Sequence, residues 1–369
     1  MLRSLLPALL AVSVLIPHAE PAAAQGWQDE LGQQIQRIDR QSNGKLGVYV
    51  KRLATGETYS HAADQPWYLS STVKVPIAIT VLRQVDAGKL GLQSPLTLQE
   101  QDKVDGAGEL LWAENGSQYS VESLLTRMLG VSDNTAANLL IRTAGIDNLN
   151  GTAKSLLGKQ VQLTDFVTVR REIYAELHPD ARKLDNQQLI KVAGPDIGPQ
   201  RVAAIRRELD LREADLKAKS FGEAYARYYQ RDMNTATLQG YGDMLEQLVR
   251  GKLLSAQSTQ TLFKMMKYGR RGDYRLEGGI PKSEMIIHKT GTQHRRACHM
   301  AVINPQDIAK AIVVATCASD LNDRTEAGVV FQRVGKAVSD VLISRADAES
   351  EASNDTRNLV EAQTGTTRR

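Results

Sequence analysis

The order of strand and helix patterns along the chain restricts the folds that this sequence can adopt. Two short strand-like stretches precede residue 66, three more follow residue 261, and the long region between them has helical periodicity. The early strands are KLGVYVKR and a segment near residue 59, and the late ones are EMIIHKTGT, RACHMAVI and KAIVVATC. Because strands need partners for their backbone groups, we predict an α/β (α+β) fold with one five-stranded antiparallel sheet assembled from both ends of the chain.

Amphipathic helices near the two ends are expected to cover this sheet. The first helix, residues 28–40, has an apolar side formed by Leu31, Ile35 and Ile38. The last helix has an apolar side formed by Val329, Val330, Phe331, Val334, Val338 and Leu342. We therefore expect an α/β lobe of residues 28–65 and 262–345, packed on an all-helical lobe of residues 66–261, with a groove between the lobes as a place for a site.

The ends of the chain differ in composition from the part between them. Arg3 precedes the apolar run LLPALLAVSVLI, and AEPAAAQGW follows, which is the pattern of a secretory signal peptide over residues 1–24. The run is too short to span a bilayer comfortably, so we expect cleavage after Ala24, no membrane span in the mature protein, and a periplasmic or secreted location; a retained anchor is the alternative. Residues 346–369 are polar and are expected to form a disordered tail.

The overall composition argues against one class of partner. Of the 369 residues, 42% are hydrophobic and 24% are charged, which is typical of a soluble globular protein. The formal charge is +4, and the basic residues are interleaved with acidic ones. The sequence also contains no Gly-rich phosphate-binding loop, so we expect no nucleic-acid partner.

The chain has two cysteines, Cys298 and Cys317, in adjacent strand patterns joined by NPQD. A hairpin that turns at Pro305 and Gln306 would place Cys298 opposite position 313. Cys317 would then lie four residues further along the strand, ~13 Å away. Because that separation exceeds the reach of a disulfide, we predict two free thiols, and their spacing fits no metal site.

Residues 178–231 stand apart within the helical region because they are rich in mixed charge. The stretch GPDIGPQ divides this segment, and RVAAIRRELDLREADLKA has helical periodicity through Val202, Ile205 and Leu209. We expect an inserted helical pair whose charges form a solvated face. A partner-binding role for those charges is the alternative.

Lys74 lies inside the otherwise apolar stretch LSSTVKVPIA, where an ammonium loses hydration unless it has partners. If this stretch is helical, Ser71 and Lys74 lie on one face, a turn apart. A desolvated lysine loses its proton more readily and could act as the base that a weak serine nucleophile needs. The plainer interpretation is that Ser70 or Ser71 caps the helix and Lys74 is exposed.

Two further stretches have plain interpretations when each is taken alone. VSDNTAAN would cap a helix through Asp133 or Asn134, and HKTGT would be the end of a strand. Together with Ser71-x-x-Lys74, and in this order, they resemble the signature of the penicillin-recognising serine acyl-enzymes, the superfamily of the class A β-lactamases and the penicillin-binding D,D-peptidases. The resemblance extends to STVKVPIAITVL, SDNTAANLLI and NTATLQGYGDMLEQLVRGKLLS, and covers most of residues 28–345.

This resemblance implies both a fold and a reaction. The fold is a five-stranded antiparallel sheet, flanked by N- and C-terminal helices and packed on an all-helical lobe, within a catalytic domain of residues 25–345. Ser71 matches the nucleophile, Lys74 the lysine that helps to activate it, and Ser132 the hydroxyl that passes a proton to the leaving nitrogen. Asn134 matches the side chain that holds the acylamide of the substrate. The resemblance implies no metal and no other cofactor.

The late strand would supply the remaining contacts with the substrate. Lys289 matches the cation that supports the serine of the Ser-Asp-Asn stretch and attracts the substrate carboxylate. Thr290 and Thr292 match the hydroxyls that bind this carboxylate, and Gly291 lies between them. The backbone N–H groups of Ser71 and Thr292 match the oxyanion hole.

The chain departs from the class A pattern in two places. By count along the strand, Cys298 stands where many class A enzymes have a carboxylate-binding arginine, so Arg296, two residues earlier, is the expected stand-in. The Ω-loop glutamate is expected at Glu172, because RRE at residues 170–172 completes Arg-x-Glu, but the proline and asparagine of the family loop are missing. Glu176 is the fallback, and a plain pairing of Glu172 with a neighbouring arginine is the alternative.

Three functions are compatible with these residues. The first is a class A β-lactamase, in which acylation of Ser71 is followed by rapid hydrolysis. The second is a penicillin-binding D,D-peptidase or carboxypeptidase that acts on peptidoglycan and keeps the antibiotic as a slow acyl-enzyme. The third is a non-catalytic sensor or binding module, against which the intact set of serines and lysines argues. The expected partner is a small β-lactam or a peptidoglycan stem peptide, and we expect a monomer.

Overall fold

Strands from both ends of the chain form one five-stranded sheet in the order β2-β1-β9-β8-β7. β1 (Lys45–Arg52) and β2 (Thr58–His61) come first in the sequence, and β7 (Ile286–Gln293), β8 (Arg296–Ile303) and β9 (Ile312–Ser319) come last. All neighbouring strands pair antiparallel. The predicted fold class is therefore confirmed, and β7, which carries the Lys-Thr-Gly-Thr stretch, lies at one edge of the sheet.

The computed structural model describes residues 26–194, 197–267, 274–321 and 325–344. The predicted signal peptide, residues 1–24, and the predicted polar tail, residues 346–369, lie outside the described residues. Among the described residues, none of the helices combines the length and the apolar character that a membrane span requires.

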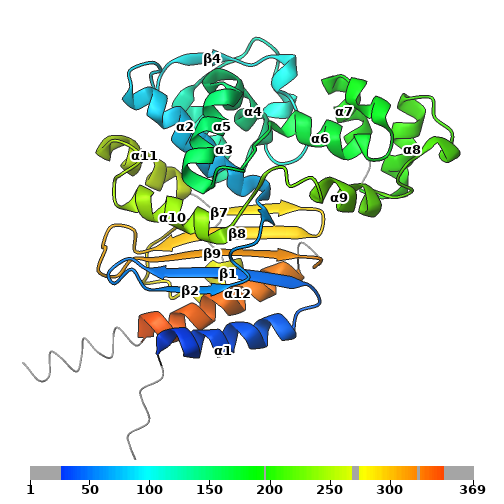
Figure 1. Ribbon diagram of the computed structural model, residues 1–369. Coiled ribbons are helices and arrows are strands. Elements are labelled where there is room, and N and C mark those ends of the chain that lie inside the picture. Colours follow the sequence, from blue (N-terminus) through cyan, green and yellow to red (C-terminus); the bar gives the residue numbers. More distant parts are fainter. Residues whose placement is uncertain (1–25, 195–196, 268–273, 322–324, 345–369) are drawn as a thin grey trace, which may run out of the picture.

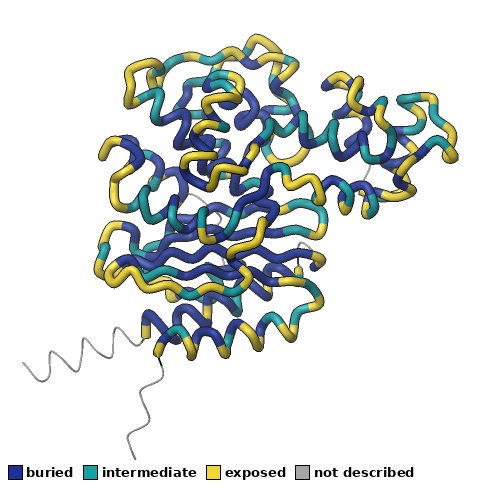
Figure 2. Tube along the Cα trace, viewed as in Figure 1, coloured by how far each residue is buried: buried dark blue, intermediate teal, exposed yellow. Residues whose placement is uncertain are grey.

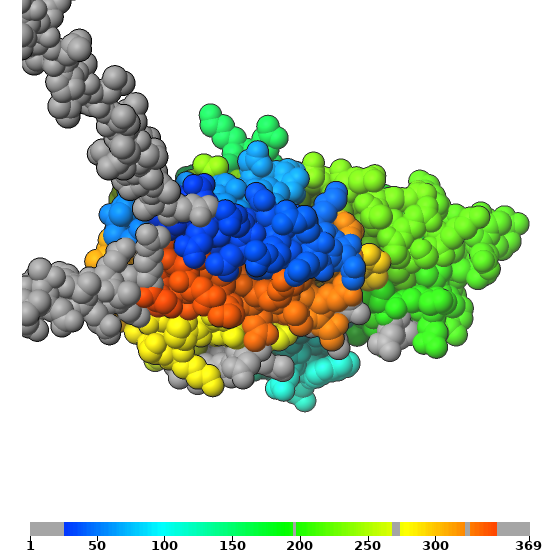
Figure 3. Space-filling view, turned by 90° about the horizontal axis from the view of Figure 1, so that it is seen from below, coloured from blue at the N-terminus to red at the C-terminus, as the bar shows by residue number. Residues whose placement is uncertain are grey.

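Helices cover both faces of the sheet (Figure 1). α1 (Trp27–Arg40) and α12 (Glu326–Val338) pack together on one face, and they lie side by side in the view from below (Figure 3). α10 (Leu238–Val249) contacts β1 and β9 on the opposite face. Because β9 is covered on both sides, all its residues are buried and its sequence is almost continuously apolar.

The helical lobe surrounds α2 (Lys74–Asp86), which follows a short 3₁₀ turn, η1 (Ser70–Val73). α2 is apolar on nearly every side because other helices pack around it. These neighbours are α3 (Val121–Gly130), α4 (Asn134–Ala144), α5 (Ile146–Leu157) and α11 (Ala256–Met266). Two small ribbons complete the lobe: β3 (Trp67–Tyr68) with β6 (Thr235–Ala236), and β4 (Pro95–Thr97) with β5 (Gln118–Ser120).

The charged segment 178–231 projects from the side of the helical lobe, next to α6 (Phe166–Ala175) (Figure 1). Its described residues, 178–194 and 197–231, form three α-helices where a pair was expected: α7 (Asn186–Ala193), α8 (Pro199–Glu208) and α9 (Phe221–Tyr229). Their apolar sides pack with α6 in a cluster of their own, and the exposed residues lie mainly on the outside (Figure 2).

Short helical segments connect the longer elements. The 3₁₀ segments are η2 (Glu100–Asp102), η3 (Leu110–Trp112), η4 (Pro179–Lys183), η5 (Glu213–Asp215) and η6 (Arg275–Gly279), and η7 (Ser339–Ile343) is a short π-helix after α12.

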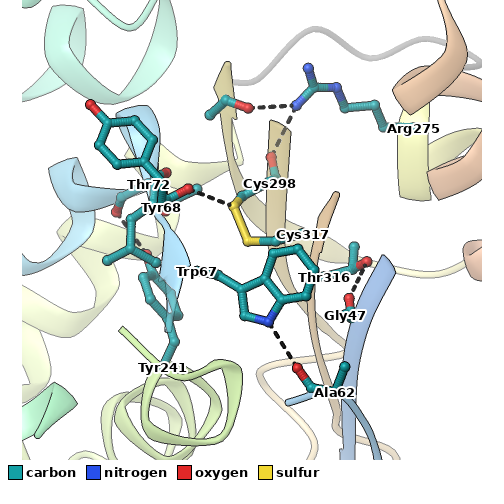
Figure 4. The surroundings of a disulfide bond; sticks show 12 residues. Gly47, Ala62, Trp67, Tyr68, Thr72, Tyr241, Arg275, Cys298, Thr316 and Cys317 are labelled. Carbon is teal, nitrogen blue, oxygen red and sulfur yellow. Dashed lines mark hydrogen bonds between the residues drawn. A yellow bond between two sulfur atoms is a disulfide. The ribbon is translucent and has the colours of Figure 1, made fainter. Parts of the chain in front are cut away.

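The prediction of two free thiols is wrong, because Cys298 and Cys317 form a disulfide between β8 and β9 (Figure 4). The two residues are direct partners in the strand register, and their Cα atoms are 4.0 Å apart. The connection between β8 and β9 is longer than the tight turn that we assumed and runs from residue 304 to 311. The register therefore shifts, and Cys298 faces Cys317 instead of position 313.

We expect replacement of both cysteines by alanine to lower the free energy of unfolding by about 3 kcal/mol, because the cross-link restricts the unfolded chain. Urea unfolding of the purified wild type and of the double variant would measure the difference. The wild type unfolded in the presence of a reductant should reproduce the loss. A change below about 1 kcal/mol in both experiments would show that strand pairing alone provides this stability.

Candidate active site

Ser71 lies on η1, where the chain enters α2 against the edge strand β7. Gly291 of β7 permits this close approach, since a Cβ on Gly291 would lie 2.9 Å from the backbone nitrogen of Ser71 and 2.7 Å from the carbonyl oxygen of Leu69. Ser70 has the left-handed backbone φ of 51°, which turns the chain immediately before Ser71. The nucleophile candidate is thus held directly beside the backbone of the Lys-Thr-Gly-Thr strand.

Lys74 is completely buried, so the alternative of an exposed lysine is wrong. Its Nζ lies 3.3 Å from Ser71 Oγ and 3.0 Å from Ser132 Oγ. It also lies 2.6 Å from the Ser132 carbonyl oxygen and 2.7 Å from Asn134 Oδ1. Burial, and next the nearby charge of Lys289, hold the pKa of Lys74 well below its usual value. This environment favours a neutral amine, whose lone pair can accept the hydroxyl proton of Ser71.

Lys289, like Lys74, contacts Ser132. Its Nζ donates to Ser132 Oγ at 3.1 Å and to the Thr290 carbonyl oxygen at 2.8 Å. Burial, followed by the charge of Arg275, lowers the pKa of Lys289 to about 7. A continuous set of side-chain contacts therefore joins Ser71, Lys74, Ser132 and Lys289, and the structure brings together these four residues predicted from the sequence.

Asp133 and Asn134 fix the loop that carries Ser132. Asp133 caps α4, since its Oδ1 accepts from the Ala136 N–H at 2.8 Å. Asn134 Nδ2 donates to the Asp105 carbonyl oxygen at 3.0 Å, so the amide is held with its oxygen on Lys74. The capping interpretation is thus correct for Asp133, and it coexists with a site role for the two neighbouring residues.

Sequence reasoning did not identify Arg275, a buried arginine on η6. Its Nη2 donates to Thr292 Oγ1 at 2.6 Å, and its Nη1 donates to the carbonyl oxygens of Gly291 and Cys298 at 3.1 and 3.0 Å. Arg275 thereby places a guanidinium beside Gly291 and Thr292 of β7. No local pattern in the sequence distinguishes it from the other basic residues, because it reaches this position through the fold.

Arg296, which was predicted to replace the arginine that many class A enzymes have at the position of Cys298, lies away from Thr292. It begins β8, its Nη1 pairs with Asp320 Oδ1 at 2.8 Å, and its guanidinium lies 4.6 Å from the centre of the Tyr229 ring. Alternation along the strand was the only basis for that prediction. In the described structure the contact with Thr292 comes from Arg275.

Glu172 is held by arginines, as the plain alternative stated, and not beside Ser71. Its carboxylate accepts from Arg182 at 2.9 and 2.8 Å and also binds Arg231. The hydrogen bond from Arg182 is the largest of the effects that lower the pKa of Glu172 to about 2. Glu176 lies 3.4 Å from the same Arg231, and neither glutamate lines the cavity at Ser71. The structure therefore gives no support to either residue as the deacylation base.

A cavity opens beside Ser71, and α6 presents an apolar ring to it. Phe166 is the first residue of α6, and its N–H donates to Asn138 Oδ1 at 2.8 Å. Its ring centre lies 4.6 Å from Lys74 Nζ. The described residues that line the cavity include one carboxylate, Asp105, which is paired with Arg170 Nε at 2.6 Å. The other lining residues include Tyr68, Val104, Asn134, Thr164, Val169, Asn234, Thr292 and Gln293.

We expect the rate of acylation by an anionic β-lactam to fall as the pH rises through about 7, because Lys289 then loses the charge that attracts the substrate carboxylate. Its ammonium form predominates below that pH, so the effect is fully present on the acid side. Lys289→Arg should keep its charge across this range and retain much more activity than Lys289→Ala, which should lose roughly 10- to 100-fold. Stopped-flow acylation between pH 5 and 9 would measure this, and equal losses in both variants would contradict a role based on charge.

Comparison with known proteins identifies the family of this chain. Residues 30–342 match the model of the β-lactamase enzyme family. A curated β-lactamase of Rhodobacter capsulatus is 32% identical over 127 residues, which are 34% of this chain and 43% of that protein. The β-lactamase VEB-1 of Pseudomonas aeruginosa is 23% identical over 266 residues, which are 72% of each chain. The chain thus spans less than half of the first relative and about three quarters of the second.

Solved structures show the same fold. A β-lactamase from Xanthomonas campestris has a TM-score of 0.63 and 21% identity, and the match covers 85% of this chain and 98% of that one. PBP-A, solved as a point variant in an acyl-enzyme complex with penicillin G, has a TM-score of 0.59 and 20% identity, with 85% and 96% covered. At these identities the similarity concerns the fold alone.

Proposed function

Because this chain belongs to the β-lactamase enzyme family, we propose that it is a serine hydrolase that opens the β-lactam ring through an acyl-enzyme on Ser71. The observation that carries this proposal is the contact of the buried Lys74 with both Ser71 and Ser132. A serine nucleophile needs an adjacent base, and a neutral lysine of lowered pKa is such a base. A binding module would not need this arrangement.

Acylation follows from the geometry around Ser71. Lys74 takes the hydroxyl proton while Ser71 Oγ attacks the lactam carbonyl carbon. The N–H groups of Ser71 and Thr292 stabilise the resulting oxyanion, and the close approach at Gly291 supports this pairing. Ser132 passes a proton to the leaving nitrogen as the carbon–nitrogen bond breaks, and Lys74, whose Nζ lies 3.0 Å from Ser132 Oγ, gives Ser132 the proton that it took from Ser71. Lys289 stabilises the charge that develops on Ser132 during this transfer.

The carboxylate of the substrate is placed beside Lys289 and Thr292 of β7. Lys289 and Arg275 supply positive charge there, and Thr292 supplies a hydroxyl that already contacts Arg275. Asn134 holds the acylamide from the opposite wall of the cavity. Substrates of this site therefore carry an amide on one side of the reacting carbonyl and a carboxylate on the other, as β-lactams and peptidoglycan stem peptides do.

Release of the acyl group distinguishes two candidate functions, and the residues beside Ser71 favour the penicillin-binding D,D-peptidase over the class A β-lactamase. Hydrolysis of an acyl-enzyme needs a base that activates water. Phe166 presents a ring to Lys74, and Glu172 is engaged by Arg182 and Arg231. We propose that the β-lactam remains on Ser71 as a slowly hydrolysed ester. The capture of PBP-A, a neighbour in fold, as an acyl-enzyme with penicillin G is compatible with this proposal.

We also propose that the protein acts as a monomer in the periplasm or outside the cell, on small β-lactams or on stem peptides. The apolar run and the Ala-x-Ala ending before Ala24 support this location. Mass spectrometry of the secreted protein would test it, and the expected mature N-terminus is Gln25.

Peptide mapping tests the acyl-enzyme directly. The mature protein is incubated with labelled penicillin, denatured, digested and analysed by mass spectrometry. One penicillin should be attached to the peptide that contains Ser71, and the fragment ions should place it on Ser71. Label confined to Ser70, or no label together with no hydrolysis, would overturn the proposal.

A further inference from the structure

Two buried histidines and a glutamate form a chain of contacts behind β7. These three residues take no part in the acylation steps proposed for Ser71. His299 on β8 and His288 on β7 are 0% and 6% exposed. His299 Nε2 lies 2.9 Å from His288 Nδ1, and His288 Nε2 lies 3.0 Å from Glu277 Oε1 on η6. At the other end, the Leu276 N–H donates to His299 Nδ1 at 3.3 Å. The chain begins and ends on adjacent residues of η6.

The Leu276 N–H fixes where the protons lie along this chain. Because it donates to His299 Nδ1, His299 must carry its own proton on Nε2 and donate to His288 Nδ1. His288 then carries its proton on Nε2, which lies 3.0 Å from Glu277 Oε1, a close polar contact without hydrogen-bond geometry. An additional proton on His299 Nδ1 would set two N–H groups against each other, because the Leu276 N–H already points at this nitrogen. Burial is the largest of the effects that keep the pKa of His299 well below its usual value.

The chain holds the segment that carries Arg275. Arg275 precedes Leu276, and its backbone has the left-handed φ of 58°, which costs free energy for a residue with a side chain. α12 presses on this segment, since a Cβ on Gly335 would lie 2.3 Å from the Leu276 carbonyl oxygen. Arg275, Leu276 and Glu277 are thus tied in succession to the strands β7 and β8 (Figure 4 shows Arg275 reaching the Cys298 carbonyl).

We propose that Glu277, His288 and His299 are positioning residues that hold Arg275 in the orientation in which its guanidinium meets Thr292 and recognises the substrate carboxylate. This inference rests on the proposed function. It assigns the specificity of the site for carboxylate-bearing substrates to a chain of polar contacts on the far face of β7. The reacting atoms at Ser71 and Lys74 are not touched by this chain, so acylation of a substrate without the carboxylate should not depend on it.

A matched pair of variants tests the chain. Glu277→Leu removes the carboxylate that contacts His288 Nε2, whereas Glu277→Gln keeps an oxygen on a side chain of the same size. Acylation is measured with a chromogenic cephalosporin and with its carboxylate methyl ester. Glu277→Leu should lower the acylation constant for the free acid by roughly tenfold, the effect of weakening the contact between Arg275 and the substrate carboxylate, and leave that for the ester unchanged. Glu277→Gln should retain most of the activity on both.

Arg275→Gln serves as the reference for the lost guanidinium. If the chain acts through Arg275, the double variant Glu277→Leu/Arg275→Gln should have the same ratio of acid to ester acylation constants as Arg275→Gln alone. The reason is that the two changes remove the same contact. Equal losses on acid and ester, or fully additive losses, would overturn the inference in favour of a general structural role. Since Ser71 must still react with the ester, failure of the proposed function itself would appear separately, as loss of all labelling.

Discussion

Ser71→Ala is expected to lower the rate of covalent labelling by a β-lactam by roughly 10⁴-fold or more, the scale on which removal of a serine nucleophile acts. Ser71 Oγ is the hydroxyl that contacts the buried amine of Lys74, at 3.3 Å. Neighbouring Ser70 offers a matched control, because its Oγ is buried and has no hydrogen-bond partner among the described residues. Ser70→Ala should therefore label at close to the wild-type rate, as followed by intact-mass spectrometry.

The opposite pattern would reassign the nucleophile. Labelling that survives Ser71→Ala and disappears in Ser70→Ala would show that η1 rearranges to present the other serine to Lys74. Circular dichroism and the thermal midpoint of each variant separate this outcome from a failure to fold. Ser70 needs that control most, because it has a left-handed backbone beside the close approach at Gly291.

Phe166→Glu is expected to accelerate hydrolysis of the acyl-enzyme by about 10²-fold, the lower part of the range for a positioned general base. The side chain at 166 begins α6 and faces Lys74 across the cavity. A carboxylate there could accept a proton from a water molecule on the open side of the ester. Phe166→Leu removes the ring without adding a base and should leave the lifetime of the acyl-enzyme nearly unchanged.

Glu172→Ala is the second control for this prediction. Glu172 is bound by Arg182 and Arg231 away from the cavity, so its loss should not lengthen the lifetime of the acyl-enzyme. Single-turnover measurements of deacylation would compare all three variants with the wild type. If Glu172→Ala stabilised the adduct and Phe166→Glu did not shorten its lifetime, α6 would have to reposition in solution and Glu172 would be the base after all.

The sheet could be predicted from the sequence because each strand has a local pattern of its own. The strands must also pair with one another, since their backbone N–H and C=O groups need hydrogen-bond partners. The site residues could be predicted because three short motifs, Ser71-x-x-Lys74, Ser132-x-Asn134 and Lys289-Thr290-Gly291, together resemble the signature of a known superfamily. The structure brings Ser71, Lys74, Ser132 and Lys289 into contact. The sequence left two interpretations of Lys74, exposed or buried, and the structure shows that it is buried. The role predicted for Lys74 from its local sequence is therefore compatible with its environment in the structure.

The features that could not be predicted depend on register or on long-range contacts. The disulfide required the length of the β8–β9 connection, and an assumed turn displaced Cys317 from its partner by four residues. Arg275 reaches Thr292 from a separate turn, and alternation along β8 pointed to Arg296 instead. Glu172 satisfied a motif, but the helix that carries it turns its carboxylate toward Arg182.

Mixing the mature protein with a chromogenic cephalosporin, in moderate excess, tests the central claim most directly. Formation of an acyl-enzyme on Ser71 that is slowly hydrolysed predicts a rapid burst of colour equal to one equivalent of enzyme, followed by a much slower linear phase. Ser71→Ala should give neither phase. Rapid linear turnover without a burst would contradict slow release and favour the class A β-lactamase, and the absence of any reaction would contradict the acyl-enzyme itself.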